Sequence, residues 1–140
     1  MKIKEFLKNI QKKKNAITLI EEQIDTLKLM AEYKGVAIDP NQPSRGTDNP
    51  HRTEDYICRA VDLSNKLNQI KIEYLVDVEK ATGMILNLND DKTLQIFWRR
   101  YIKFMKWETI ASELGITYQW TLKLHGRGLE ELNKKYPDFS

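Results

Sequence analysis

The 140-residue sequence is poor in the residues that hold metals and disulfides: it has one cysteine, Cys58, and two histidines, His51 and His125. A single cysteine excludes a disulfide within the chain, and two histidines with one cysteine cannot make the four-ligand set of a structural zinc site. A cytoplasmic location without a metal or other cofactor is therefore expected.

Long apolar runs are also missing. No run approaches the roughly 20 residues that a membrane-spanning helix needs. The first ten residues alternate lysine with isoleucine, phenylalanine and leucine, without a continuous apolar core or a small-residue cleavage site. They are typical of the start of an amphipathic helix and not of a signal peptide, so neither a signal peptide nor a membrane partner is expected.

Glycine and proline are scarce, with six and four residues, and long stretches contain neither. Because these residues interrupt helices, their scarcity favours an all-α fold. The expected architecture is two long N-terminal helices over residues 1–89, followed by a helix-turn-helix domain over residues 90–140.

The first helix is predicted over residues 3–34 from a heptad repeat of apolar residues. One set of positions holds Ile3, Ile10, Ile17, Ile24 and Ala31, and the interleaved set holds Phe6, Ile20 and Leu27, with Lys13 and Lys34 as its breaks. Gly35 can take the left-handed conformation that ends a helix. A polar linker over residues 36–52 follows.

The second long helix is predicted to start near Thr53, with Glu54 and Asp55 in its first turn. Apolar and small residues recur at steps of three and four, interrupted by Lys71: Ile57, Ala60, Ser64, Leu67, Tyr74, Val78, Ala81, Ile85 and Leu88. Two such helices could pair as a hairpin within one chain, or between two chains as a coiled coil that forms a homodimer.

A third helix is expected from a cap at Asn89-Asp90-Asp91 to about Phe104, with its apolar face on Leu94, Phe97, Trp98 and Tyr101. The net charge of the whole chain is only +3. Between Lys92 and Lys106, however, basic residues occur without an acidic one, and Glu113 is the single acid between Ser112 and Glu130. Because nucleic acids are polyanions, two stretches that contain basic residues and almost no acidic ones favour a nucleic-acid partner.

The helix-turn-helix itself is predicted from residues 107–124. Ile110 and Leu114 lie four apart on a short helix, and the small Ala111 suits the point where the next helix crosses it. Gly115 can adopt the positive φ of a tight turn. Ile116 fills the corner, and Thr117 can cap the following helix. Leu124 then points back into the core.

Residues 94–132 resemble the fourth conserved region of bacterial sigma factors, through Ile110-Ala111, Leu114-Gly115-Ile116-Thr117, Arg127 and Leu129–Leu132. With the run from Tyr118 to Leu129, the chain is similar to small phage and prophage transcriptional regulators of the ArpU type. The resemblance implies regulation of phage or prophage genes and contact with host RNA polymerase. Two residues depart from the pattern: Thr121 replaces Val or Ile, and Gly128 replaces Ala. The Thr121 hydroxyl would need a backbone acceptor within its helix, and Gly128 should weaken the helix by about 1 kcal/mol.

A recognition helix presents its first turns to the major groove. With Thr121 and Leu124 turned inward, the candidates for base contacts are Tyr118, Gln119, Leu122 and Lys123. Gln119 suits adenine, and Lys123 suits guanine or phosphate. The candidates for phosphate contacts are Arg99, Arg100, Lys103 and Lys106. Trp120 is expected to pack against the third helix, and His125 and Arg127 are weaker candidates for contact.

The sequence shows no catalytic constellation, so the protein is not expected to be an enzyme. The leading hypothesis is a regulator that binds double-stranded DNA in a sequence-specific manner. Two alternatives stay open: the small DNA-recognition subunit of a phage packaging terminase, and a module that binds polymerase without binding DNA.

Overall fold

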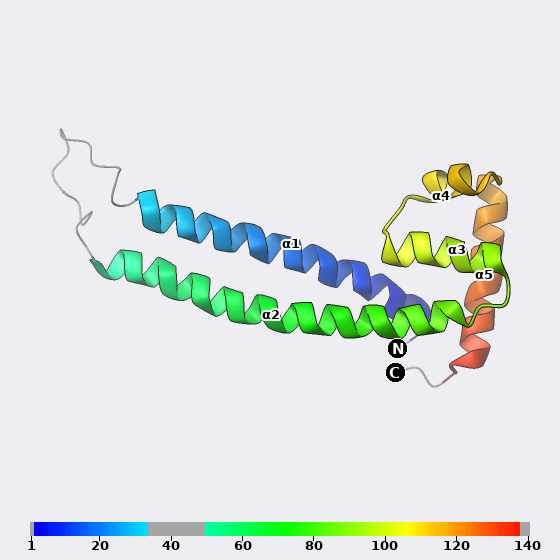
Figure 1. The fold of residues 1–140 in the computed structure, drawn as a ribbon, viewed down its shortest axis with the longest axis horizontal. Coiled ribbons are helices and arrows are strands. Elements are labelled where there is room, and N and C mark those ends of the chain that lie inside the picture. The colour runs from blue at the N-terminus through cyan, green and yellow to red at the C-terminus, as the bar shows by residue number, and fades with distance from the viewer. Residues whose placement is uncertain (1, 34–49, 138–140) are drawn as a thin grey trace. The chain divides into compact units, whose positions relative to one another are not determined.

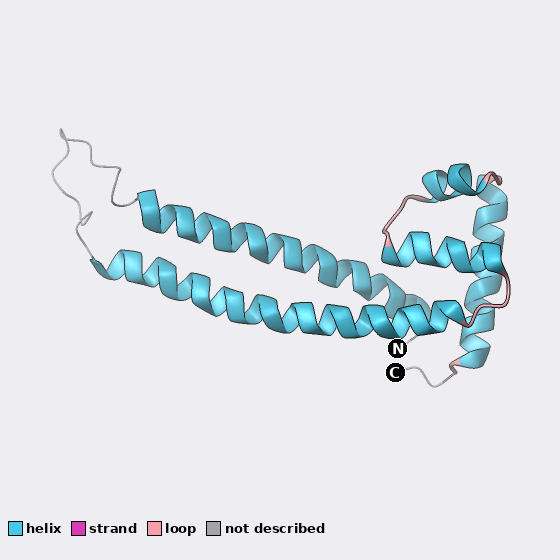
Figure 2. Ribbon diagram, viewed as in Figure 1, coloured by secondary structure: helices cyan, strands magenta, loops and turns pink. Residues whose placement is uncertain are grey.

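The computed structural model describes residues 2–33 and 50–137, and every regular element in them is a helix (Figures 1 and 2). The elements are α1 (Ile3–Tyr33), α2 (Pro50–Leu86), α3 (Asp91–Phe97), the π-helix η1 (Trp98–Ile102), α4 (Trp107–Leu114) and α5 (Tyr118–Lys135). No strand occurs in these residues, so the all-α prediction is confirmed. None of the helices described is both long and apolar enough to cross a membrane.

The chain forms two compact units, and the boundary between them is not at residue 89. Met1–Lys14 and Glu73–Ser140 make up unit 1, and Asn15–Ile72 makes up unit 2. Both long helices therefore contribute to both units. The first turns of α1 and the last turns of α2 belong with the predicted helix-turn-helix, because they share its core.

The heptad repeat predicts the buried side of α1 correctly at most positions. Its buried members are Ile3, Phe6, Ile10, Ile17, Ile24 and Leu27. Leu7, outside the repeat, is also fully buried. Lys13, the break in the repeat, lies opposite α2, where its ammonium is 2.5 Å from the carboxylate of Asp77. The two long helices thus pair within one chain, and a homodimer formed through them stays a prediction.

The helix α2 begins three residues earlier than predicted, at Pro50, because proline has no N–H to lose in a first turn. Only the last three residues of the predicted linker 36–52 are described; Gly35 and Lys34 lie outside the described residues. Ala60, Leu67, Ala81, Ile85 and Leu88 are buried as predicted. Ile57 is not: 52% of it is exposed. It lies about 60° around the helix from Ala60, on the side away from the buried stripe.

The core of unit 1 joins elements from both ends of the chain. Its buried members are Ile3, Phe6, Leu7, Ile10, Ala81, Met84, Ile85, Leu88, Phe97, Tyr101 and Leu132. A second, smaller cluster of Ile96, Ile110 and Leu124 lies inside the helix-turn-helix. The N-terminus of α1 is therefore fixed against the elements that carry the candidate site.

The third predicted helix is confirmed at its start and altered at its end. Asp90 caps α3, accepting hydrogen bonds from the Thr93 hydroxyl at 2.8 Å and the Thr93 N–H at 3.0 Å. Both bonds hold the pKa of Asp90 below its usual value, and the bond from the Thr93 hydroxyl has the larger effect. After Phe97 the chain continues as the π-helix η1, which ends at Ile102; the Lys103 N–H donates to the Trp98 carbonyl, and Phe104 follows with a φ of 58°. The helix thus stops short of Phe104.

Candidate nucleic-acid interface

The turn between α4 and α5 has the geometry that the sequence predicts. Gly115 ends α4 with a φ of 66° and a ψ of 34°, the left-handed conformation that other residues adopt at a cost. Thr117 then caps α5, since its hydroxyl accepts the Trp120 N–H at 3.0 Å. The start of α5 is therefore fixed by two local devices, one on each side of Ile116.

The inner face of α5 packs against α3, η1 and α4. Leu124 meets Ile110 and Ile96, and Ala111 is small enough to be buried beside them. Thr121 is fully buried, and its hydroxyl donates to the Thr117 carbonyl at 2.9 Å. The predicted backbone acceptor for this hydroxyl is thus confirmed.

His125 belongs to this inner face and is buried. Its Nε2 is 2.6 Å from the Tyr101 hydroxyl, its ring stacks on Phe97 with centroids 5.0 Å apart, and Trp107 meets it edge-on at 4.7 Å. Burial, followed by the charges of nearby basic side chains, lowers the pKa of His125 to about 4. Burial also raises the pKa of Tyr101 to about 12. At neutral pH both partners of this hydrogen bond are therefore uncharged.

The four predicted base-contact residues, Tyr118, Gln119, Leu122 and Lys123, are all exposed. They do not all point the same way. At about 100° per residue, Gln119 and Lys123 lie about 160° around α5 from the buried Thr121, on opposite sides, whereas Tyr118 and Leu122 lie only about 60° and 100° from it on one flank. Gln119 and Lys123 therefore form the centre of the outward face.

Trp120 is not part of the buried core, because 38% of it is exposed, and its packing against the third helix stays a prediction. The guanidinium of Arg127 lies 5.3 Å from its ring centroid, and the ammonium of Lys123 lies 5.9 Å from it. This cation–π cluster keeps the indole on the surface. From the sequence, Trp120 is not named as a contact residue and Arg127 is named only as a weaker candidate; their spacing with Lys123 on one helix face is the available signal for the cluster.

The four residues predicted to contact phosphates differ in whether their side chains bind other groups of the protein. Arg99 donates from Nε to Glu113 at 3.0 Å and from its terminal nitrogen to Gln95 at 3.0 Å. Glu113 is the one acid within residues 112–129, and Arg99 neutralises its charge. Lys103 and Lys106 are exposed, before α4, and are the better placed of the four for a phosphate.

Arg100 also has an internal role, but it keeps its charge. Its terminal nitrogen donates to the Met105 carbonyl at 3.0 Å, and its guanidinium lies 4.4 Å from the centroid of the Trp107 ring. Neither partner is an anion. The side chain is therefore held in place while its positive charge stays uncompensated.

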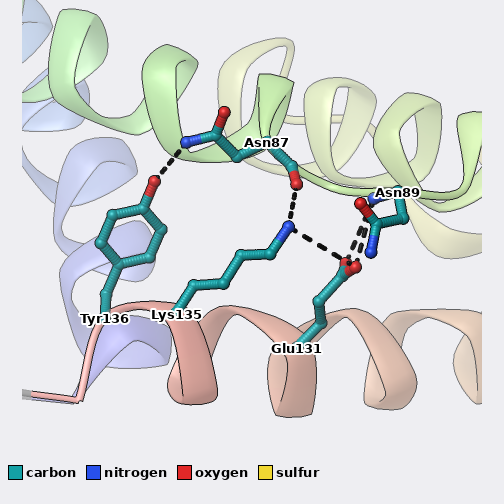
Figure 3. A network of polar contacts seen from close by, with 5 residues as sticks. All are labelled: Asn87, Asn89, Glu131, Lys135 and Tyr136. Carbon is teal, nitrogen blue, oxygen red and sulfur yellow. Dashed lines mark hydrogen bonds and ion pairs between the residues drawn. The ribbon is translucent and has the colours of Figure 1, made fainter.

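The far half of α5 is stabilised by tertiary contacts that the sequence does not reveal. Glu131 accepts the Asn89 N–H at 3.2 Å, Tyr136 is 2.5 Å from the Asn87 amide, and Lys135 bonds the Asn87 carbonyl (Figure 3). Gly128 packs so closely that a Cβ there would lie 2.4 Å from Cε1 of Phe97. Gly128 therefore has a packing role that its helix propensity does not reveal: a side chain here would prevent the close approach of α3 and α5.

Comparisons with known proteins add nothing to this geometry. No family model, curated protein or solved structure matches the chain. In the described residues, no three of histidine, cysteine, aspartate and glutamate gather as a metal site. Any assignment of function therefore depends on the outward face of α5 and its surroundings.

Proposed function

We propose that the protein is a transcriptional regulator that binds double-stranded DNA in a sequence-specific manner. The observation that carries the proposal is the outward face of α5, which begins at a capped N-terminus and carries Gln119 and Lys123 with no acid before Glu130. A helix of this kind, supported by a second short helix across a tight turn, suits the major groove.

Each side chain of this face has a chemically matched role in the proposal. The Gln119 amide can bond to N6 and N7 of adenine, and Lys123 can donate to O6 or N7 of guanine. Tyr118 and Leu122, on one flank, are suited to a thymine methyl group or to the sugar edge. Lys103 and Lys106 would contact phosphates beside the groove and fix the register of the helix.

The proposed regulatory role follows from the resemblance of residues 94–132 to the fourth region of sigma factors. In this proposal the protein acts on phage or prophage promoters and contacts host RNA polymerase. No feature of the described residues specifically favours a packaging subunit, so the regulator is the function that we put forward.

The test is a binding titration against fragments upstream of the genes in its own genome, read by fluorescence anisotropy at fixed salt. We expect one or a few fragments to bind at least a thousandfold more tightly than unrelated duplex. Equal, weak binding to every fragment would contradict the proposal.

Variants then test the face itself. Gln119→Ala and Lys123→Ala should each cost about 1–3 kcal/mol in binding to the preferred fragment. Asn133→Ala and Lys134→Ala are matched controls, because these exposed residues lie near the C-terminus of the same helix. If the control pair weakened binding as much as the test pair, the outward face near Thr117 would not be the reading surface.

A further inference from the structure

A pocket of about 270 Å³ lies on the Tyr118 and Leu122 flank of α5, within unit 1. It is bounded by the first turns of α1, by η1 and the loop after it, by the start of α4, and by α5. Its basic side chains come from Lys4, Lys8 and Arg100, and its aromatic ones from Tyr101, Phe104, Trp107 and His125. Segments almost a hundred residues apart in the sequence thus build one concave surface.

The charge of this pocket has one sign. Lys4 and Lys8 are four residues apart on α1, and none of the described residues that line the pocket is acidic. Lys4, Lys8 and Arg100 form no ion pair with a carboxylate in the described part of the chain. Like charges at this spacing destabilise a helix. An anion between them would remove that cost.

Packing determines which side of α1 the two lysines occupy, and two contacts orient Arg100. Ile3, Leu7 and Ile10 are buried between and beside the two lysines, so the register of α1 determines which side the lysines occupy. Arg100 is oriented by its hydrogen bond to the Met105 carbonyl and by the Trp107 ring. The backbone of α1 and the Arg100 guanidinium are thus already in position beside the pocket.

The same three positive charges also act on His125, which lines the pocket. After burial, the charges of Lys4, Arg100 and Lys8 each lower the pKa of His125. Three positively charged side chains from two separate segments are thus close enough to His125 to disfavour its protonated form.

We propose that this pocket binds a phosphate group, and that its source is a backbone phosphate of the DNA held by α5. Ammonium and guanidinium groups are the usual phosphate ligands of proteins. Leu122 lies at the edge of the pocket and on the flank of the outward face, so a strand bordering the major groove passes this side of α5. This assignment rests on the proposed DNA binding, but the existence of the pocket does not.

In this arrangement the start of α1 is part of the DNA-binding surface. From the sequence, residues 3–34 are predicted as a helix that pairs with the second long helix, and the candidates for phosphate contacts all lie after residue 98. Lys4 and Lys8 add phosphate contacts from the N-terminal end of the chain.

The experiment measures the salt dependence of DNA affinity for the whole chain. The test variant is the double substitution Lys4→Gln/Lys8→Gln. The matched control is Lys12→Gln/Lys28→Gln, which removes the same charge from exposed positions of α1 outside the pocket. A Lys4→Arg/Lys8→Arg variant keeps the charge, and circular dichroism establishes that all variants are folded.

We expect the test variant to lose about tenfold in affinity near 0.15 M salt. The slope of log K against log[salt] should fall by about 1, the change expected for one lost phosphate contact. The control and the arginine variant should keep the parent slope. Equal slopes for test and control would overturn the assignment to the DNA backbone.

A second titration, of pyrophosphate into the parent protein without DNA, distinguishes a free phosphate from a backbone one. Saturable binding that is lost in the test variant, together with an unchanged DNA salt slope, would establish the anion site and overturn its assignment to DNA. If pyrophosphate does not bind and the salt slope does not change, the proposal that the pocket binds a phosphate group is overturned. If the parent binds no DNA, the proposed function fails, and the pyrophosphate titration alone decides the pocket.

Discussion

The inner and outer faces of α5 differ in how closely they are packed, and two glycines show the difference. Gly128 is buried, and a Cβ there would clash with Phe97 and Thr93, whereas a Cβ at Gly126 would meet nothing within 4 Å. The inner face thus has no spare volume, while the outer face has no internal partner at this position. Substitutions on the inner face should change stability, and those on the outer face should change binding.

The largest effect is expected for Gly128→Ala. The added methyl group would overlap the Phe97 ring, which lies among fully buried side chains and has no space into which to move. Overpacking should cost about 3 kcal/mol, more than the helix propensity gained from alanine. Urea unfolding followed by circular dichroism measures the loss. A neutral or stabilising result would mean that α3 and α5 are farther apart than described.

The buried histidine should make stability depend on pH to a similar extent. Because the folded pKa of His125, about 4, lies below the ordinary value of 6.5, the unfolded chain binds a proton more readily than the folded one. Stability should therefore be complete above about pH 6.5 and fall as the pH drops toward 4, by an amount on the order of 3 kcal/mol.

The non-titrating variant His125→Gln isolates this contribution from that of the carboxylates. Unfolding free energies of parent and variant are compared at several pH values between 7 and 4.5. The parent should lose more stability across this window than the variant. Parallel curves would show that His125 is protonated as easily in the folded protein as in the unfolded chain.

A smaller effect, of opposite sign, is expected for Gly126→Ala. The position is exposed and helical, and the methyl group enters open space, so the folded state should gain about 1 kcal/mol from helix propensity and reduced chain entropy. The same urea titration serves for this variant. A loss of stability would show that Gly126 has a packing role like that of Gly128.

The smallest effect on stability is expected at the centre of the outward face. Gln119→Ala and Lys123→Ala should change the unfolding free energy by less than about 0.5 kcal/mol, because the exposed side chains make no buried contact. These are the substitutions that should weaken DNA binding most. A large loss of stability in either variant would remove the distinction between the two faces.

Much of the helix-turn-helix could be predicted because its signals are local. Gly115 and Thr117 act within one turn of their own positions, and the acceptor of the Thr121 hydroxyl is the carbonyl four residues before it. Trp120 could not be placed in this way, since burial of a large aromatic depends on what lies opposite. Two of its neighbours are cations on its own helix, and 38% of the residue is exposed.

The sequence by itself determined the all-α class, most of the buried stripes of the two long helices, and the turn that starts α5. These follow from periodicity and from backbone conformations, which extend over only a few residues. Only the tertiary structure decided that Gly128 is a point of close approach, that Arg99 is neutralised by Glu113, and that Lys4 and Lys8 lie beside Arg100. Each of these depends on distance between residues far apart in the chain, which is determined by how the helices pack.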